Sequence, residues 1–260
     1  MPVADISVHE SVWPSRWRSS LIDCLRRRAF DARFHYESPA QTAAWLALHE
    51  AHSPARSDPA VARLYPDAIG GCLSRMRAPA RLASLGCGGG QKDLDVLRAC
   101  GAPAYAAIDV APGMVIEALR RIRANLPTVA TRALVADLRA NQAIASWTLG
   151  AFRAQGPTLW LAFGIVPNIP AAPEDIRFAV IPPDGALPWR IEATLPVQKN
   201  CQISLHGDCL LLPADEPLRL FFSNRFTPDE ICNMASAAGC QVAASRIAPS
   251  REDGVFEVHR

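Results

Sequence analysis

The sequence predicts an α/β fold built on a parallel, Rossmann-like sheet, and three observations lead to this prediction. Short apolar strand patterns alternate with helix patterns from residue 81 onward. The first strand pattern runs directly into a glycine-rich loop, 86–90, and the next two each end near an aspartate, Asp109 and Asp137. Repeated strand–helix units form parallel sheets that helices cover on both faces. Ligands of such sheets bind at the carboxyl ends of the strands, where these glycines and aspartates are expected.

Each element of this alternation has a local signal. The stretch 92–101 has Leu94 and Leu97 on one helical face and ends in glycine, which is a helix stop signal. The stretch 112–126 begins with Pro112, a residue that the first turn of a helix accepts. The expected strands cover 81–86, 104–110, 131–138, 158–166 and 187–197, and further helices are expected around 141–155 and over 174–181.

The end of the chain departs from this alternation. Thr227 and Glu230 have the spacing of a capping box, which predicts a helix over 227–239. Two strand patterns, 240–248 and 254–260, then flank a short polar turn. They predict an antiparallel pair that closes the chain.

Residues 1–80 have helix patterns separated by turns, and we expect them to form a helical cap on an α/β domain spanning 81–260. The N-terminus lacks the basic segment and apolar run of a signal peptide. No window approaches the roughly 18 apolar residues of a membrane span. The expected protein is therefore cytoplasmic and makes no membrane contact.

Composition narrows the possible partners. The 27 Lys+Arg residues nearly balance the 25 Asp+Glu residues, so a nucleic-acid partner is not expected. The eight cysteines form no C-x-x-C pair, which favours free thiols over a structural zinc site. His49 and His52 lie one helical turn apart without a third ligand, and we interpret them as surface residues rather than a metal pair. A small-molecule substrate is expected, and the oligomeric state is left open.

The loop "GCGGGQ" at 86–91 is the first candidate binding element. It is not a phosphate-binding P-loop, because Lys92 is not followed by Ser or Thr. It also lacks the third glycine of the dinucleotide pattern, whose place Lys92 and Asp93 take. Glycine adopts backbone angles that other residues avoid and lets a ligand approach the main chain. The shorter pattern suits an amino-acid-bearing sulfonium better than a pyrophosphate.

Two acidic residues strengthen this interpretation. Asp109 lies about twenty residues after the loop, the spacing at which a carboxylate accepts hydrogen bonds from ribose hydroxyls. Asp137, in "VADL", could reach the exocyclic amine of an adenine. A single aspartate after a strand is more often a helix cap. Three consecutive strands that end in glycines, Asp and Asp favour a nucleoside site.

The motifs "LGCGGGQKDLDVL", "AIDVAPGMVIEA" and "VADL" resemble those of class I S-adenosylmethionine-dependent methyltransferases. The stretches "LWLAFGIVPNI", "RFTPDEI" and "DGVFEVHR" further resemble the histidine Nα-methyltransferase family of ergothioneine biosynthesis. The resemblance covers most of residues 30–260 and is strongest at the glycine loop. It implies a seven-stranded class I methyltransferase sheet, S-adenosyl-L-methionine as cofactor and a role in secondary metabolism.

The resemblance also implies the site residues. On the cofactor side the implied residues are Gly86, Cys87, Gly88, Gly90, Asp109, Val110, Asp137, Leu138 and Phe163. The glycines would face the methionine part, Asp109 the ribose and Asp137 the adenine. On the acceptor side Asn168, Tyr36 and Ser223 match residues of the family's substrate site. Phe221 stands where that family has a glutamate, and the region before residue 218 is shorter than the family's substrate domain.

Three functions stay open at this point. The first, favoured by the resemblance, is methyl transfer to a small amine, amino acid or related metabolite, with His35 among the candidate bases. The second keeps the cofactor but breaks another sulfonium bond, by aminocarboxypropyl transfer or by cyclisation that releases methylthioadenosine. The third is a module that binds a nucleoside or a partner without catalysis.

Overall fold

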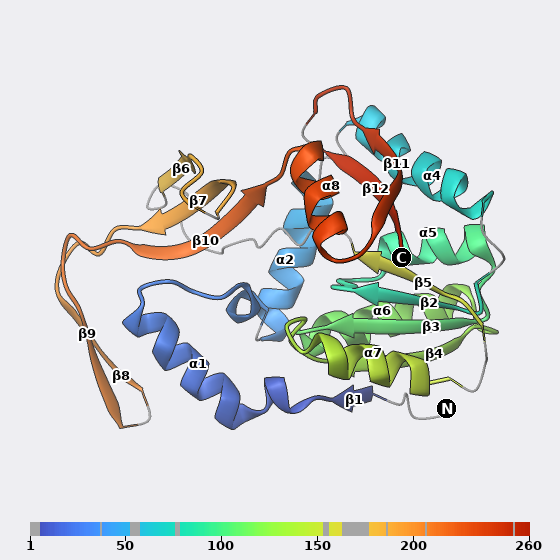
Figure 1. Ribbon diagram of the computed structural model, residues 1–260. Helices are drawn as coiled ribbons and strands as arrows, with labels where there is room; N and C mark the ends of the chain where they lie inside the picture. The colour runs from blue at the N-terminus through green and yellow to red at the C-terminus, as the bar shows by residue number, and fades with distance from the viewer. Residues whose placement is uncertain are drawn as a thin grey trace.

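A five-stranded parallel sheet forms the centre of the molecule, and its strand order is β1-β4-β3-β2-β5 (Figure 1). The computed structural model describes residues 6–36, 38–52, 58–75, 79–152, 156–162, 177–185, 187–205, 207–251 and 253–260. The five strands are β1 (Ile6–Val8), β2 (Arg81–Leu85), β3 (Ala104–Asp109), β4 (Ala130–Val135) and β5 (Thr158–Ala162).

Helices cover both faces of this sheet, as the alternation predicts. Helices α5 (Gln91–Cys100) and α6 (Pro112–Asn125) pack on one face, and α7 (Asn141–Gly150) packs on the other. The buried residues of α6 recur on one side of the helix: Met114, Val115, Ala118, Leu119 and Ile122. All six residues of β3 are buried, as expected for a strand between two helical layers. The α/β prediction is confirmed.

The sheet differs from the expected seven strands, since five strands pair in it among the described residues. The segment expected as its fifth strand is β7 (Trp189–Leu195), which forms a separate antiparallel sheet with β6 (Arg177–Ile181) and β10 (Leu218–Arg225). The reason lies in its polarity. Arg190 and Glu192 alternate with apolar residues in β7, whereas a strand inside a doubly covered sheet has to be apolar on both faces.

The helix expected over 174–181 is wrong where the structure describes it. Residues Arg177–Ile181 form β6, which pairs with β7 in antiparallel register. The sequence "RFAVI" contains an aromatic and two β-branched residues, which suit a pleated surface, and the pairing with β7 decides the conformation. A second hairpin that the sequence patterns miss joins β8 (Cys201–Leu205) and β9 (Asp208–Leu212).

The C-terminal prediction is confirmed. Helix α8 (Pro228–Ala237) begins with a reciprocal cap, in which Thr227 Oγ1 accepts the Glu230 N–H and Glu230 Oε2 accepts the Thr227 N–H. Strands β11 (Gln241–Ile247) and β12 (Gly254–His259) then pair in antiparallel fashion.

The N-terminal residues include more than the expected helices. The helices are η1 (Glu10–Val12), α1 (Pro14–Arg26), η2 (Ala32–His35), α2 (Pro39–His52) and α4 (Pro59–Leu73). Strand β1 pairs with β4 and so belongs to the central sheet itself. Helix α4 runs through Pro66, although "LYPD" at 64–67 is a turn pattern in the sequence, and Asp58 is its N-cap. The domain boundary at residue 80 stays a prediction.

Two further expectations bear on the chain as a whole. The eight cysteines all lie among the described residues and form no disulfide, and Cys201, Cys209 and Cys232 are exposed. Within the described ranges, no helix combines the length and the apolar character that a bilayer crossing requires.

Candidate functional site

The glycine loop follows β2 at the carboxyl edge of the sheet. Gly86, Gly88 and Gly90 have φ angles of 68°, 51° and 70°, in the left-handed region that favours glycine. The N–H groups of Gly86 and Cys87 both donate to the carbonyl oxygen of Ile108, at 2.8 and 3.1 Å. The loop is thus tied to β3 and held in one conformation, with main chain rather than side chains at its surface.

Helix packing requires a glycine at position 90, and position 89 is crowded only by the end of a flexible side chain. A Cβ atom on Gly90 would lie 2.9 Å from the Cα of Ala118 in α6, and one on Gly89 would lie 2.9 Å from Leu46 Cδ2 in α2. Helix α2 lies at the ends of β2 and β3, where this loop turns (Figure 1). Packing against α6 is therefore sufficient to explain Gly90 without a ligand.

Asp109 lies at the end of β3 and faces the loop. Its Oδ2 accepts the Gly88 N–H at 3.0 Å, and its Oδ1 accepts the Ala111 N–H at 3.0 Å. Burial raises the pKa of this carboxyl, while the N–H donors of Ala111 and Gly88 act in the opposite direction. Asp109 therefore fixes the shape of the glycine loop as well as lying beside it. The sequence pattern gave it only the second role.

A buried carboxylate, for which the sequence pattern gives no signal, also lies near the glycine loop. Asp93, in the first turn of α5, accepts hydrogen bonds from the Tyr105 hydroxyl at 2.5 Å and from Ser84 Oγ at 3.0 Å. Burial raises the pKa of Asp93 to about 6, against the lowering effect of these donors. Its partners lie in β3 and β2, so this residue connects the helix to both strands that carry the site. In the sequence, Asp93 is visible only as a departure from the dinucleotide glycine pattern.

Replacement of Asp93 by asparagine is expected to change how stability depends on pH. The folded-state pKa of about 6 lies above the ordinary value of 3.8, so the folded protein binds this proton more tightly. The resulting stabilisation is present below the ordinary pKa and is lost as the pH rises through about 6. The difference in unfolding free energy between wild type and Asp93→Asn should therefore fall by about 3 kcal/mol over this window. Urea unfolding at several pH values measures it, and a pH-independent difference would contradict the assignment.

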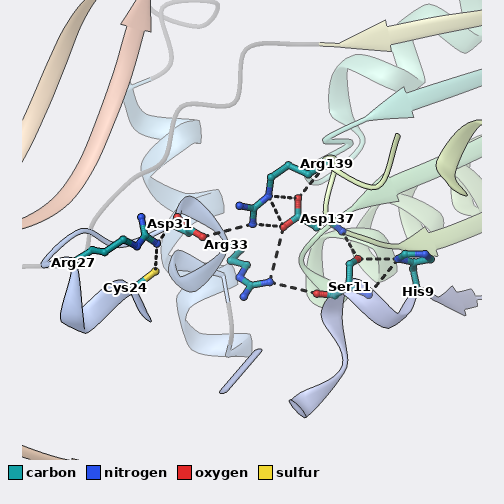
Figure 2. A network of polar contacts seen from close by, with 8 residues as sticks. All are labelled: His9, Ser11, Cys24, Arg27, Asp31, Arg33, Asp137 and Arg139. Atoms are coloured by element: carbon teal, nitrogen blue, oxygen red, sulfur yellow. Dashed lines mark hydrogen bonds and ion pairs between the residues drawn. The ribbon is translucent and has the colours of Figure 1, made fainter. Parts of the chain in front are cut away.

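Asp137 is engaged by arginines, as Figure 2 shows. Arg139 Nε lies 2.9 and 3.0 Å from the two carboxylate oxygens of Asp137 and Arg33 Nη1 lies 3.9 Å from Oδ2. Arg139 also contacts Asp31 at 3.5 Å, and the Asp137 N–H donates to Ser11 Oγ. Partial burial acts to raise the pKa of Asp137, but the hydrogen bonds and charges of the arginines outweigh it and lower the pKa.

This network joins the N-terminal segment to the end of the sheet. Arg33 and Asp31 precede α2 by only a few residues, and Ser11 follows β1. In Figure 2 Arg33 and Ser11 contact Asp137 from the N-terminal elements, and Asp31 contacts Arg139, which approaches Asp137 from the chain after β4. A ligand that uses Asp137 has to share the carboxylate with Arg139, which the sequence pattern did not indicate.

The remaining expected site residues occupy different places. Tyr36 is buried and packs with Ala111 and Met114, next to Asp109, in a cluster that includes Val110 at its edge. Leu138 packs against the core cluster on the α7 face of the sheet. Ser223 lies on β10 opposite Ile191 of β7, and no described contact joins it to the glycine loop. Phe163 and Asn168 lie outside the described residues.

His35 has a connecting role. It is buried, its Nε2 lies 3.1 Å from the carbonyl oxygen of Leu220 in β10, and burial lowers its pKa. The contact attaches the segment before α2 to the antiparallel sheet. The described contacts of the His35 ring are the Leu220 carbonyl oxygen and the ring of Tyr36. Neither contact supports the interpretation of His35 as a catalytic base.

A cavity of about 400 Å³ lies away from this site. It is enclosed by α4, β5 and the β11–β12 hairpin, and its rim includes Cys72, Arg75, Glu257 and His259. Arg75 and His259 both pair with Glu257 there. None of the residues expected to bind the cofactor lines this cavity, so it provides a second location against which the glycine-loop site can be tested.

No protein-family model and no curated protein matches this chain. Among solved structures, CalS10, an amino pentose methyltransferase from Micromonospora echinaspora, is 19% identical, with 81% of this chain and 95% of that chain covered and a TM-score of 0.36. The glycopeptide N-methyltransferase MtfA is 13% identical, with 75% and 91% covered and a TM-score of 0.35. The DhpI–SAM–HEP complex is 14% identical, with 93% and 98% covered and a TM-score of 0.40. With all three scores below 0.5, the chain's own geometry has to carry any functional conclusion.

Proposed function

We propose that this chain is an S-adenosylmethionine-dependent methyltransferase that acts on a small metabolite bearing an amine. One observation carries the proposal. The left-handed glycines 86 and 88, Asp109 and Asp137 follow three adjacent parallel strands, β2, β3 and β4. The strand order reverses between β2 and β5, and open α/β sheets bind their ligands outside the carboxyl ends at such a switch point.

Asp109 would bind the ribose while it keeps its hydrogen bonds to Gly88 and Ala111. An ionised carboxylate has about four lone-pair positions. The N–H groups of Gly88 and Ala111 occupy one on each oxygen and the Val110 N–H also acts on this carboxylate, which leaves lone-pair capacity for a ribose hydroxyl. A ribose bound here would lie beside the exposed main chain of the glycine loop, which suits the amino-acid part of the cofactor.

Asp137 and Arg139 provide a matched pair of variants for the adenine end. Asp137→Ala is expected to weaken S-adenosylmethionine binding about tenfold or more, because a hydrogen bond to a charged acceptor is lost. Arg139→Ala should leave binding unchanged or tighten it, because it frees the carboxylate from three close contacts. Calorimetric titration of both variants measures this. Weaker binding only in Arg139→Ala would contradict the adenine assignment.

In this proposal the protein aligns two reactants and excludes water. S-adenosylmethionine, when bound, supplies a methyl group on an electrophilic sulfonium. Proximity and orientation contribute roughly 7–11 kcal/mol in favourable cases, so an amine that is already neutral needs little proton transfer. The neutral imidazole of His35 holds β10 against the segment that contains Tyr36. Tyr36, packed on Ala111, would form the wall between the ribose and the acceptor.

The product nucleoside tests the reaction. Purified protein is incubated with S-adenosylmethionine alone and then with amine and amino-acid mixtures, and the nucleoside is identified by mass. S-adenosylhomocysteine that forms only with an acceptor supports methyl transfer. Methylthioadenosine would instead indicate attack on another sulfonium carbon, and binding without either product would contradict an enzymatic role.

A further inference from the structure

One face of the antiparallel sheet collects charged side chains. Paired residues of neighbouring strands lie on the same face, and the register pairs Glu192 with Phe222 and Arg190 with Asn224. Arg219, opposite Thr194, lies on this face as well, because Thr194 and Glu192 are two residues apart in β7. We call these five residues the arginine face: Arg190, Glu192, Arg219, Phe222 and Asn224.

The arginine face has an excess of positive charge. Glu192 Oε1 lies 2.7 Å from Arg190 Nε and 3.4 Å from Arg219 Nη1, so a single carboxylate is shared by two guanidinium groups. The side chains of Arg190 and Glu192 are 14% and 15% exposed, whereas that of Arg219 is 37% exposed and opens to solvent. The Arg219 guanidinium also lies over the Phe222 ring, at 5.2 Å. The two arginines and the one glutamate together leave a net charge of +1 on this partly buried face.

Three buried polar atoms of this face have no hydrogen-bond partner among the residues that the structure describes. They are Arg190 Nη1, Arg219 Nε and Asn224 Oδ1. Buried polar groups are nearly always satisfied, and a guanidinium N–H is costly to leave without an acceptor. Two donors and one acceptor, with a net positive charge, complement an oxyanion that has a hydroxyl or ammonium group beside it.

The arginine face is connected to the proposed methyl-transfer site. The edge of β10 bonds to the N-terminal segment, where the Arg219 N–H donates to the carbonyl oxygen of Arg28 and the Phe30 N–H donates to that of Arg219. The next contact along this segment joins His35 to Leu220, and Tyr36 then packs against Ala111 beside Asp109. These contacts attach the strand that carries Arg219 to the segment that packs beside Asp109.

We propose that the arginine face binds an oxyanion group, a carboxylate or a phosphate, of the methyl acceptor. The inference deepens the proposed function and rests on it for the identity of the ligand as an acceptor. Arg190 Nη1 and Arg219 Nε donate to the oxyanion, and Asn224 Oδ1 accepts from a neighbouring hydroxyl or ammonium. Glu192 holds the two guanidinium groups in place and is a positioning residue.

Binding of small anions tests this face independently of any turnover. Acetate, phosphate and neutral acetamide are titrated into the protein while the side-chain Nε–H resonances of arginine are followed by NMR. Saturable shifts of Arg190 and Arg219 with acetate or phosphate, and none with acetamide, are expected. The preferred anion distinguishes a carboxylate from a phosphate ligand. Equal shifts with acetamide, or none with either anion, would overturn the proposal.

Variants separate this site from general charge effects. Arg219→Gln and Arg190→Gln should weaken the preferred anion at least about tenfold. Arg219→Lys keeps the charge but lacks the Nε donor, so its affinity for the anion should lie between those of wild type and Arg219→Gln. This variant provides the test if a glutamine variant fails to fold. Arg177→Gln is the matched control, because Arg177 lies on the same face of the sheet in exposed surroundings and should leave the affinity unchanged. Equal weakening in Arg177→Gln would overturn the proposal.

Acceptor profiling distinguishes failure of this inference from failure of the proposed function. With S-adenosylmethionine present, glycine is compared with glycinamide, and an amino-sugar phosphate with the free amino sugar. Preference for the anionic member of a pair, lost in Arg219→Gln, supports the inference. Turnover without such preference would overturn the inference alone. Absence of cofactor binding would contradict the proposed function, while the anion titration would still decide the arginine face.

Discussion

Asp109→Ala is expected to weaken S-adenosylmethionine binding about 100-fold or more, a loss of about 3 kcal/mol. The carboxylate has two functions that alanine cannot replace. It accepts the N–H groups of Gly88 and Ala111, each at 3.0 Å, and in the proposed site it also accepts a ribose hydroxyl. Loss of the first function lets the loop relax, and loss of the second removes a charge-assisted hydrogen bond. Isothermal titration calorimetry measures the change.

Two further variants make the Asp109 result interpretable. Asp95→Ala removes an exposed carboxylate from α5. The affinity of this variant should remain within about twofold of wild type, because that carboxylate makes a 3.7 Å surface pair with Arg98 on its own helix. Asp109→Asn keeps one acceptor and should lie between wild type and alanine. Affinity within about threefold of wild type in a folded Asp109→Ala variant would show that Asp109 does not contact the cofactor.

The second large effect is expected for Gly90→Ala, which should destabilise the protein by about 3 kcal/mol. Gly90 has a φ of 70°, and a new Cβ would lie 2.9 Å from the Cα of Ala118. That atom belongs to the backbone of α6 and cannot move away without shifting the helix. The variant should also lose cofactor affinity. Gly90 ends the glycine loop and is the N-cap of α5, so a displacement of Gly90 shifts both elements.

Gly101→Ala is the matched control for this prediction. Gly101 has a similar φ of 62°, but nothing lies within 4 Å of the added Cβ. Alanine there introduces the backbone strain alone, which is about 1 kcal/mol. Urea unfolding of the two variants separates strain from overlap. Equal destabilisation of the two variants would mean that contact with α6 does not restrict the side chain at position 90.

Local patterns in the sequence were sufficient for the central elements. Three signals depend on residues only a few positions apart: the glycines after β2, Pro112 at the start of α6 and the Thr227–Glu230 cap. The structure places each of them where the pattern indicated. The position of Asp109 also follows from a local signal, because it ends a strand of apolar residues. Its hydrogen bond to Gly88, twenty-one residues away, follows from the loop having to cross the end of β3.

Long-range pairing explains what the sequence did not show. Residues 177–181 became a strand because β7 is available to pair with them. Arg33 reaches Asp137 only because the N-terminal segment runs along the edge of the sheet. Arg139 had a local signal, since it lies two residues after Asp137, but an aspartate followed by arginine is common on protein surfaces. Tyr105 and Asp93 meet through the parallel pairing of β2 and β3, and a single sequence carries no sign of that contact.

Hydrogen exchange with and without S-adenosylmethionine tests the central claim most directly. The account predicts that saturating cofactor slows exchange of the backbone amides at residues 86–90 and 109–111, with smaller changes near Asp137. Protection confined to α4 and the β11–β12 hairpin, around the 400 Å³ cavity, would place the ligand elsewhere and contradict the glycine-loop site. Unchanged exchange throughout the chain at saturating cofactor would contradict it as well.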